Sequence, residues 1–321
     1  MTKKYNMKKS SNKKRYGVLI LLISSFWMGL LPITLNGLII HEASPLQDFN
    51  QEVPTIKTSL PSDATDFDYY KVISIDHNKV YGTVNLVNFP ILLSISDSDL
   101  SDHCQGDGDD IAFAQGDIWL AHEIESYSSG NLLVWVEVLL LSPLVDTEIS
   151  MYFGDSEMGS QQNQAGTWNL DYSGVYHFSE SNPSGNIEDS AGINDDVTNN
   201  MESDDDENSK IGRGFDFDYS TLLGILLLDD DNIEFPNTVW SAGDISVSFW
   251  MKAKRTKNMV PMCKFSYSDR EAGGWKLALE SDGDINFQVG NDGNHASITS
   301  NGHYSSNVLL LQILFSTQNL S

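Results

Sequence analysis

The residues of this chain that most suggest chemistry are four consecutive ones, His122, Glu123, Ile124 and Glu125. A histidine followed by a glutamate begins the H-E-x-x-H motif, in which two histidines on one helix face hold a catalytic zinc. Here Ser126 stands in the place of the second histidine, and the surrounding residues alternate as in a strand. The stretch therefore does not predict a zinc protease.

The two glutamates of this stretch suggest a second chemistry. Alternate residues of a strand share one face, so the carboxylates of Glu123 and Glu125 should lie side by side. Carboxyl pairs about 5–5.5 Å apart are the machinery of retaining glycoside hydrolases. The same alternation predicts an acidic, solvent-exposed face opposite Ile118, Leu120 and Ile124, and we favour that interpretation. Hydrolysis of an extracellular polysaccharide stays open as an alternative.

Acidic residues also gather in residues 97–110, between two predicted strands. Ca²⁺ prefers carboxylate oxygens, but an EF-hand loop that began at Asp107 would need a glutamate where Ile118 stands. We expect a solvated loop here, with calcium binding as the alternative. The chain contains no G-x-S-x-G nucleophile motif and no phosphate-binding glycine loop. We therefore predict no catalytic residues.

Four tryptophans could act as platforms on which sugars stack: Trp119, Trp135, Trp250 and Trp275. Each of them lies in a stretch that alternates as a strand does. Packing in a core is the commoner role of a tryptophan in such a position, and it is the role that we expect.

The composition excludes nucleic acid as a partner. The 321 residues include 45 acidic and 19 basic ones, for a formal net charge of -26. Phosphate binding needs clustered Lys and Arg, so such a surface repels nucleic acid. Hydrophobic residues make up 40% of the chain, enough for about two domains with real cores. The two cysteines, Cys104 and Cys263, lie too far apart to indicate a disulfide framework or a zinc site.

The N-terminus has the pattern of an export segment. Residues 17–40 carry no charge, and a helix of that length would span about 36 Å, more than a hydrocarbon core of about 30 Å. The basic residues in 8–15 should stay cytoplasmic, which places the rest of the chain outside. Residues 1–40 are thus either a membrane anchor or a cleaved signal peptide. Residues 41–65 are polar, contain three prolines and predict an extended spacer.

Short strands separated by turn residues fill residues 66–158. The apolar or alternating runs are 67–75, 84–95, 111–114, 118–124, 132–140 and 149–153. Pro90 inside the second run indicates an edge strand or a bulge. Because no amphipathic helix separates these runs, the pattern predicts a β-sandwich.

A second β unit is predicted for residues 170–321. Its expected strands are 175–178, 214–217, 233–235, 245–251, 275–279, 285–289 and 296–299. Turn residues at 281–283 and 291–293 predict two hairpins among the last three strands. The acidic run 202–207 predicts a solvated loop.

These stretches resemble two known families. Residues 70–77, 88–95, 107–113, 122–127, 133–136 and 151–154 resemble, in order, the domain of unknown function 2341 family, which brings no established activity. Residues 174–178, 189–192, 211–217 and 245–252 resemble laminin-G-like jelly rolls of the concanavalin type. Such a jelly roll should need further strands after Ser321, so we expect it to be truncated.

The second resemblance implies glycan or protein binding, often with one structural Ca²⁺. The positions that match its calcium ligands are Asp189, Asn194 and Asp216. Three oxygen donors form only part of a calcium shell. Calcium is the one cofactor that the sequence suggests.

Taken together, the sequence predicts an all-β protein with two β-sandwich modules, the second a partial jelly roll, after an N-terminal hydrophobic helix. The expected function is that of an exported, non-catalytic binding or adhesion protein at the cell surface, either membrane-anchored or secreted. Its expected partners are extracellular glycans or proteins, besides the membrane that its N-terminal segment meets. The alternatives are a polysaccharide hydrolase and a truncated gene fragment without independent function.

Overall fold

The computed structural model describes residues 61–192, apart from 62, 170 and 171, and short stretches between residues 198 and 299. The described chain forms two compact units, and each is treated by itself below. The first contains residues 61–178 and 187–192, and the second contains residues 179–186 and the stretches from 198 onward. Among the described residues no helix is long and apolar enough to cross a membrane. The predicted export segment 1–40 lies outside these residues, as does the spacer up to residue 60.

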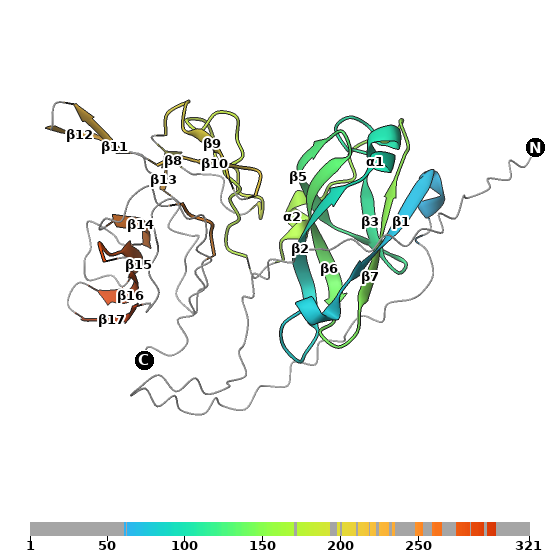
Figure 1. The fold of residues 1–321 in the computed structure, drawn as a ribbon, viewed down its shortest axis with the longest axis horizontal. Coiled ribbons are helices and arrows are strands. Elements are labelled where there is room, and N and C mark those ends of the chain that lie inside the picture. Colours follow the sequence, from blue (N-terminus) through green and yellow to red (C-terminus); the bar gives the residue numbers. More distant parts are fainter. Residues whose placement is uncertain are drawn as a thin grey trace, which may run out of the picture. The chain divides into compact units, whose positions relative to one another are not determined.

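The first unit is an antiparallel β-sandwich (Figure 1). One sheet has the order β1-β7-β3-β4, with β1 Tyr69–Ile75, β7 Thr147–Phe153, β3 Ala112–Gln115 and β4 Ile118–Leu120. The other has the order β2-β6-β5, with β2 Leu86–Ser96, β6 Asn131–Leu141 and β5 His122–Ser128. The all-β class predicted from the sequence is therefore confirmed. Pro90 lies in β2, which is an edge strand, as its missing N–H requires.

One predicted strand is in fact two. Residues 118–124 were expected to form a single run, but β4 and β5 belong to different sheets. The chain crosses between the sheets at Ala121, whose carbonyl oxygen accepts a hydrogen bond of 2.9 Å from the N–H of Glu137. The even-numbered positions Ile118, Leu120 and Ile124 are apolar on both sides of this crossing, as in one continuous strand, so periodicity gave no sign of it.

Strand alternation places one apolar row of each sheet in a shared core. Its largest fully buried side chains include Ile73, Ile75, Ile91, Leu93, Phe113, Ile149 and Met151. A smaller cluster covers the other face of the four-stranded sheet and consists of Ala64, Phe67, Ala112, Ala114 and Tyr152. The two alanines leave room for the Phe67 ring, which lies 5.8 Å from that of Tyr152.

The strand register shows which loops share an end of the sandwich. Ile75, the last residue of β1, lies opposite Thr147, the first of β7. Leu86, the first residue of β2, lies opposite Leu141, the last of β6. The loops 76–85 and 142–146 therefore emerge together, and we call them the loop end. The chain enters β1 at the opposite end.

Short helices complete the first unit. The 3-10 helices are η1 Ala64–Asp66 and η2 His77–Lys79, and the α-helices are α1 Ser98–His103 and α2 Gln164–Thr167. Helix α1 lies within the acidic stretch 97–110, which was expected to be an irregular loop. It forms because the Asp97 carboxylate caps its N-terminus, accepting the N–H of Asp99 at 3.0 Å. Helix α2 packs on β5 and β6.

The second unit is also antiparallel in its described parts. Its strands are β8 Thr198–Asn199, β9 Asp206–Asn208, β10 Arg213–Phe215, β11 Tyr219–Leu222, β12 Ile225–Asp230, β13 Ile233–Glu234, β14 Met259–Lys264, β15 Gly274–Leu279, β16 Ile285–Asn291 and β17 Asn294–Thr299. The last four form a meander, and the others pair as β8 with β13, β9 with β10, and β11 with β12. Both predicted hairpins, β15–β16 and β16–β17, are confirmed. The predicted jelly roll stays a prediction.

Of three local expectations for residues 170–321, one holds in part and two were wrong. Residues 202–204 of the acidic run are exposed and lie outside any strand, as a solvated loop does, but the run enters β9 at Asp206, which accepts a 2.6 Å hydrogen bond from Arg213 Nε. Residues 175–178 are not a strand, since the N–H of Val175 donates to the Asp189 side chain and Phe178 has a φ of 54°. In the predicted strand 245–251, residues 248–251 are irregular, and the others lie outside the described residues.

Gly130 provides a test of the sandwich. It has a φ of +80° in the turn between β5 and β6, and a Cβ there would come within 2.3 Å of the Asp97 carbonyl oxygen. Gly130→Ala should lower the free energy of unfolding by about 2 kcal/mol or more, because backbone strain adds to this clash. Gly159→Ala should leave it unchanged, since a Cβ at that position meets nothing within 4 Å. Urea unfolding of both variants measures the effect, and equal midpoints would contradict it.

Candidate functional site

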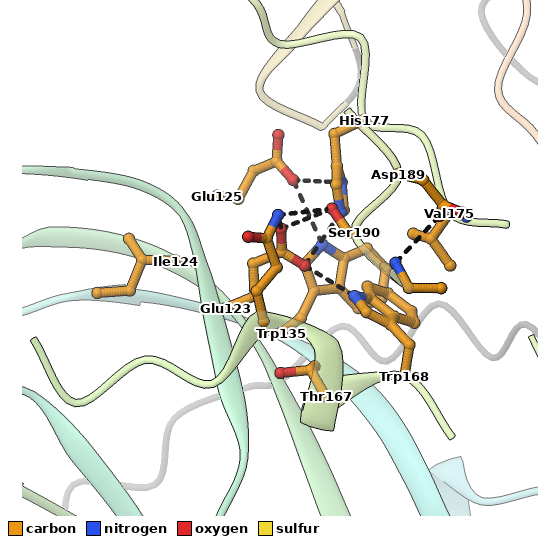
Figure 2. A network of polar contacts seen from close by, with 12 residues as sticks. Glu123, Ile124, Glu125, Trp135, Thr167, Trp168, Val175, His177, Asp189 and Ser190 are labelled. Atoms are coloured by element: carbon orange, nitrogen blue, oxygen red, sulfur yellow. Dashed lines mark hydrogen bonds and ion pairs between the residues drawn. The ribbon is translucent and has the colours of Figure 1, made fainter. Parts of the chain in front are cut away.

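A bulge in β5 determines where the two glutamates of the sequence motif lie. Glu123 faces Trp135 of β6. The register then shifts between Ile124 and Ser126, so Glu125 is an extra residue in the strand. Ile124 packs against the sandwich core. Figure 2 shows both carboxylates on the other side of the sheet from Ile124, gathered around one histidine.

Neither glutamate faces the solvent. Glu123 is 7% exposed, and the side chain of Glu125 is 2% exposed. The predicted acidic surface is therefore wrong for these two residues. Strand alternation correctly placed them outside the core, but side chains from later in the chain cover them: Gln164, Trp168, His177 and Ser190.

The carboxylate of Glu123 accepts hydrogen bonds from three of these covering residues. Its Oε2 accepts from Trp168 Nε1 at 2.7 Å. Its Oε1 accepts from Ser190 Oγ at 2.8 Å and from Gln164 Nε2 at 2.9 Å. Gln164 belongs to α2, Trp168 follows that helix, and Ser190 comes later in the chain. Three separate positions thus converge on one buried carboxylate.

His177 lies between the two carboxylates. Its Nε2 is 3.3 Å from Oε2 of Glu123, and its Nδ1 is 2.7 Å from Oε2 of Glu125. Both ring nitrogens can donate only when the imidazole is protonated. Trp135 Nε1 also donates to Oε2 of Glu125, at 3.3 Å. We call Glu123, Glu125 and His177 the carboxylate–histidine cluster.

The electrostatics of the cluster favour its charged form. Burial lowers the pKa of His177, but hydrogen bonds to Glu123 and Glu125 and the attraction of their charges outweigh burial and raise it to about 10. Burial raises the pKa of Glu123, while its bonds to His177, Trp168 and Ser190 and the attraction of His177 bring it below the ordinary 4.5. Near neutral pH, His177 is therefore a cation and Glu123 an anion.

Side chains of the chain itself engage both carboxylates of the cluster. A retaining hydrolase needs two carboxyl groups that both reach the sugar, and here His177 occupies the space between them. The Ser190 hydroxyl donates to the Glu123 carboxylate and not to a histidine nitrogen, so it does not form the serine–histidine pair of a catalytic triad. These contacts attach His177 and Ser190, and the backbone around them, to β5.

Sequence reasoning missed four members of this network. They are Gln164, Trp168, His177 and Ser190, which follow Glu123 by 41, 45, 54 and 67 residues. No local pattern links positions so far apart. The one available sign was a histidine inside the apolar run 175–178, which suggests that the ring has a buried partner.

His122, the first residue of the motif, is separate from the cluster. It is 1% exposed, and its ring lies 5.2 Å from that of Phe113 in the sandwich core. Burial lowers the pKa of His122 to about 4. The ring is therefore neutral at physiological pH.

The acidic stretch 97–110 is only partly solvated. Asp110 is fully buried and accepts hydrogen bonds from the N–H groups of Gln105, Gly154 and Asp155, at 2.9–3.1 Å. Asp97 is 6% exposed and forms an ion pair with Lys71. The expectation of a solvated loop is wrong for these two aspartates, because backbone donors and a lysine replace water around them.

The three predicted calcium ligands do not form a described site. Asp189 is 2% exposed, and its Oδ1 accepts the N–H groups of Val175 at 2.8 Å and Ala191 at 3.0 Å. Asp216 belongs to the second unit, and Asn194 lies outside the described residues. Calcium binding by these residues stays a prediction.

A group at the loop end was not foreseen from the sequence. His77 Nδ1 lies 2.6 Å from Oδ1 of Asp146 and 3.9 Å from Oδ1 of Asp76. These three residues could offer ligand atoms to a metal ion. Asp76 and Asp146 are exposed, and Asp76 also accepts from the backbone N–H of Asn78 at 2.9 Å. The contact between His77 and Asp146 links the two loops of the loop end.

Trp135 and Trp119 pack against other side chains of the first unit, as expected. Trp135 is 5% exposed and lies 5.1 Å from Trp168, ring to ring. Trp119 is half-buried, and its Nε1 donates to Asp63 at 2.7 Å. Trp250 is also half-buried, and the side chain of Trp275 lies outside the description.

Comparison with known proteins adds little. No protein-family model and no curated protein matches the chain. A crystal structure of an S-layer domain-containing protein from Clostridium thermocellum, residues 221–444, is similar at 18% identity and a TM-score of 0.32. The match covers 42% of this chain and 59% of that one, less than two thirds of its length. A likeness of this size supports no functional conclusion, and the two family resemblances stay predictions.

The cluster predicts a particular dependence of stability on pH. The raised pKa of His177 contributes stability that is complete below its ordinary 6.5 and is lost as the pH rises through about 10. The lowered pKa of Glu123 contributes stability that is present above 4.5 and is lost at lower pH. Glu123→Gln should therefore destabilise the protein most between pH 4.5 and 6.5. We expect a loss of about 3 kcal/mol there, because His177 loses one of its two buried carboxylate partners and the donors on Trp168 and Ser190 lose a charged acceptor.

Urea unfolding across a pH series measures this effect. Glu157→Gln is the matched control, since Glu157 is exposed in the same unit and its replacement should change little at any pH. A loss that does not vary with pH, or one no larger than that of the control, would show that the cluster does not stabilise the fold.

Proposed function

We propose that this chain is an exported, surface-held protein that binds a partner without catalysis, as an adhesion or binding module. The observation that carries the proposal is the closed state of the carboxylate–histidine cluster. The one pair of carboxylates that the sequence offered for polysaccharide hydrolysis is buried and bound by His177. Export still rests on the charge and length of residues 1–40.

The loop end supplies a surface suited to binding. Four large apolar side chains of the loop end are 63–76% exposed: Tyr81, Val84, Leu144 and Val145. They come from two loops that emerge together, joined by the contact of His77 with Asp146. Soluble proteins rarely gather exposed apolar residues, and where they do, the patch often marks an interaction site.

The chemistry of the loop end favours a protein partner over a glycan. Three of its four apolar side chains are aliphatic and present no flat ring on which a sugar can stack. The carboxylates of Asp76 and Asp146 lie exposed on the same loops. A complementary partner would place an apolar patch against the loop end, with basic residues around it.

The position of the loop end fits a surface-held protein. The chain enters β1 at Tyr69, at the other end of the sandwich from Ile75 and the loop 76–85. An anchor ahead of residue 61 would therefore attach on the far side from the loop end. Its apolar side chains would then be presented outward.

Substitutions at the loop end test the proposal. The full chain would be immobilised and screened against extracellular proteins and a glycan array, and the affinity of a captured protein measured. Replacing Leu144 and Val145 together by serine should weaken that binding about tenfold or more, since both would lose a desolvated contact. Val72→Ser is the control, because Val72 is 49% exposed but lies on β1. If the double variant and the control bind the partner with equal affinity, the loop end is not the binding surface.

Two further outcomes bear on the class of function. If the chain binds a glycan and the loop-end substitutions do not weaken this binding, the partner is a glycan and its site lies elsewhere on the protein. Release of reducing sugar from a polysaccharide, abolished by Glu123→Gln and kept in Glu157→Gln, would overturn the non-catalytic proposal in favour of a hydrolase.

A further inference from the structure

A lysine at a core-facing position of β1 meets a buried aspartate that follows β2. Strand alternation puts Lys71 on the same side of β1 as Ile73 and Ile75, both in the sandwich core. Lys71 Nζ lies 2.5 Å from Oδ2 of Asp97, the residue after the end of β2. Because β1 and β2 belong to different sheets, this contact spans the sandwich.

The two side chains are largely withdrawn from water. That of Lys71 is 15% exposed, and that of Asp97 is 1% exposed. Burial of a charged pair carries a large desolvation penalty, because both ions lose most of their hydration. Transfer of one proton from the ammonium to the carboxylate removes both charges. It leaves an amine beside a carboxylic acid, which are the reactants of amide formation.

The surroundings of Asp97 fix one orientation of its carboxyl group. Its own N–H donates to the carbonyl oxygen of Gly130 at 2.9 Å, and its Oδ1 accepts the N–H of Asp99 at 3.0 Å. Oδ2 is the oxygen that faces Nζ. Negative charge that developed on Oδ1 during an attack on the carboxyl carbon would already have a backbone donor aimed at it.

A second carboxylate is within reach of the same nitrogen. Oδ2 of Asp99 lies 2.8 Å from Lys71 Nζ. The side chain of Asp99 is 51% exposed, so it stays in contact with water while Asp97 does not. Asp99 can therefore accept a proton from Nζ and release it again.

We propose that the folded chain joins Lys71 and Asp97 through an intramolecular isopeptide bond, with Asp99 as the group that transfers the proton. This inference concerns a covalent modification and does not depend on the proposed binding function.

The reaction balances without an oxidant or a co-reactant. One proton passes from the Lys71 ammonium to Oδ2 of Asp97. The amine nitrogen then attacks Cγ of Asp97, and a second proton passes from it to Asp99. Asp99 returns this proton to the hydroxyl at Oδ2, which leaves as water when its bond to Cγ breaks. The products are an amide between Nζ and Cγ, one water molecule and an unchanged Asp99.

Such a bond would lock the two sheets together. It closes a covalent loop from Lys71 to Asp97, so the unfolded chain would lose conformational freedom, as it does with a disulfide. Unlike a disulfide, an amide does not respond to reductants. A protein exposed outside the cell would gain resistance to unfolding and proteolysis.

Trypsin digestion of the denatured full chain followed by mass spectrometry tests the proposal. Basic residues occur at 57, 71, 79 and then 210. An unlinked chain yields separate peptides 58–71, 72–79 and 80–210. The isopeptide bond blocks cleavage after Lys71 and leaves peptide 58–79 attached to 80–210, with a mass lower than their sum by one water molecule.

Matched variants separate the bond from ordinary structure. Lys71→Arg keeps the positive charge but cannot form this amide, so its peptides should separate completely. Lys79→Arg replaces an exposed lysine and should keep the link. Asp99→Asn should show a larger unlinked fraction in freshly made protein. A wild-type chain that unfolds cooperatively yet yields only separate peptides would overturn the proposal. Full linkage in Asp99→Asn would overturn the role given to Asp99.

Discussion

The burial of His177 between Glu123 and Glu125 is the interaction on which the covered face of the three-stranded sheet depends. Two carboxylates next to each other on a strand would repel if both were ionised and withdrawn from water. A protonated ring between them removes that conflict, and donors from Trp168, Ser190 and Gln164 satisfy the remaining oxygens of Glu123. The segment that supplies these donors is thereby fixed to β5.

The same physical solution recurs at other acids of the first unit. Asp110 accepts three backbone N–H groups, and Asp97 caps α1 and pairs with Lys71. Asp189 accepts the N–H groups of Val175 and Ala191. Loops without regular structure leave backbone donors unpaired, and a carboxylate with several acceptor sites can satisfy them. A strongly acidic chain thus uses its most buried acids as internal hydrogen-bond acceptors and the exposed ones as a charged surface.

The cluster and the loop end bear on function in two ways. The cluster argues against one activity, and the loop end offers an exposed surface. A cleft that works on a sugar must leave its carboxyl groups accessible, whereas the cluster encloses them. The exposed apolar residues lie instead on two loops at one end of the sandwich, joined by His77 and Asp146. Loops held by a rigid scaffold are common places for residues that bind a partner.

The sequence by itself determined the all-β class, nearly every strand of the sandwich and the two hairpins of the meander, and it restricted Pro90 to an edge strand or a bulge. These follow from period-two alternation and from turn residues, which act over a few neighbouring positions. Only the tertiary structure decided that Glu123 and Glu125 are buried, that residues 118–124 divide between two sheets, and that Lys71 meets Asp97. Each of these outcomes depends on partners far along the chain, and local periodicity carries no information about which distant segment covers a face.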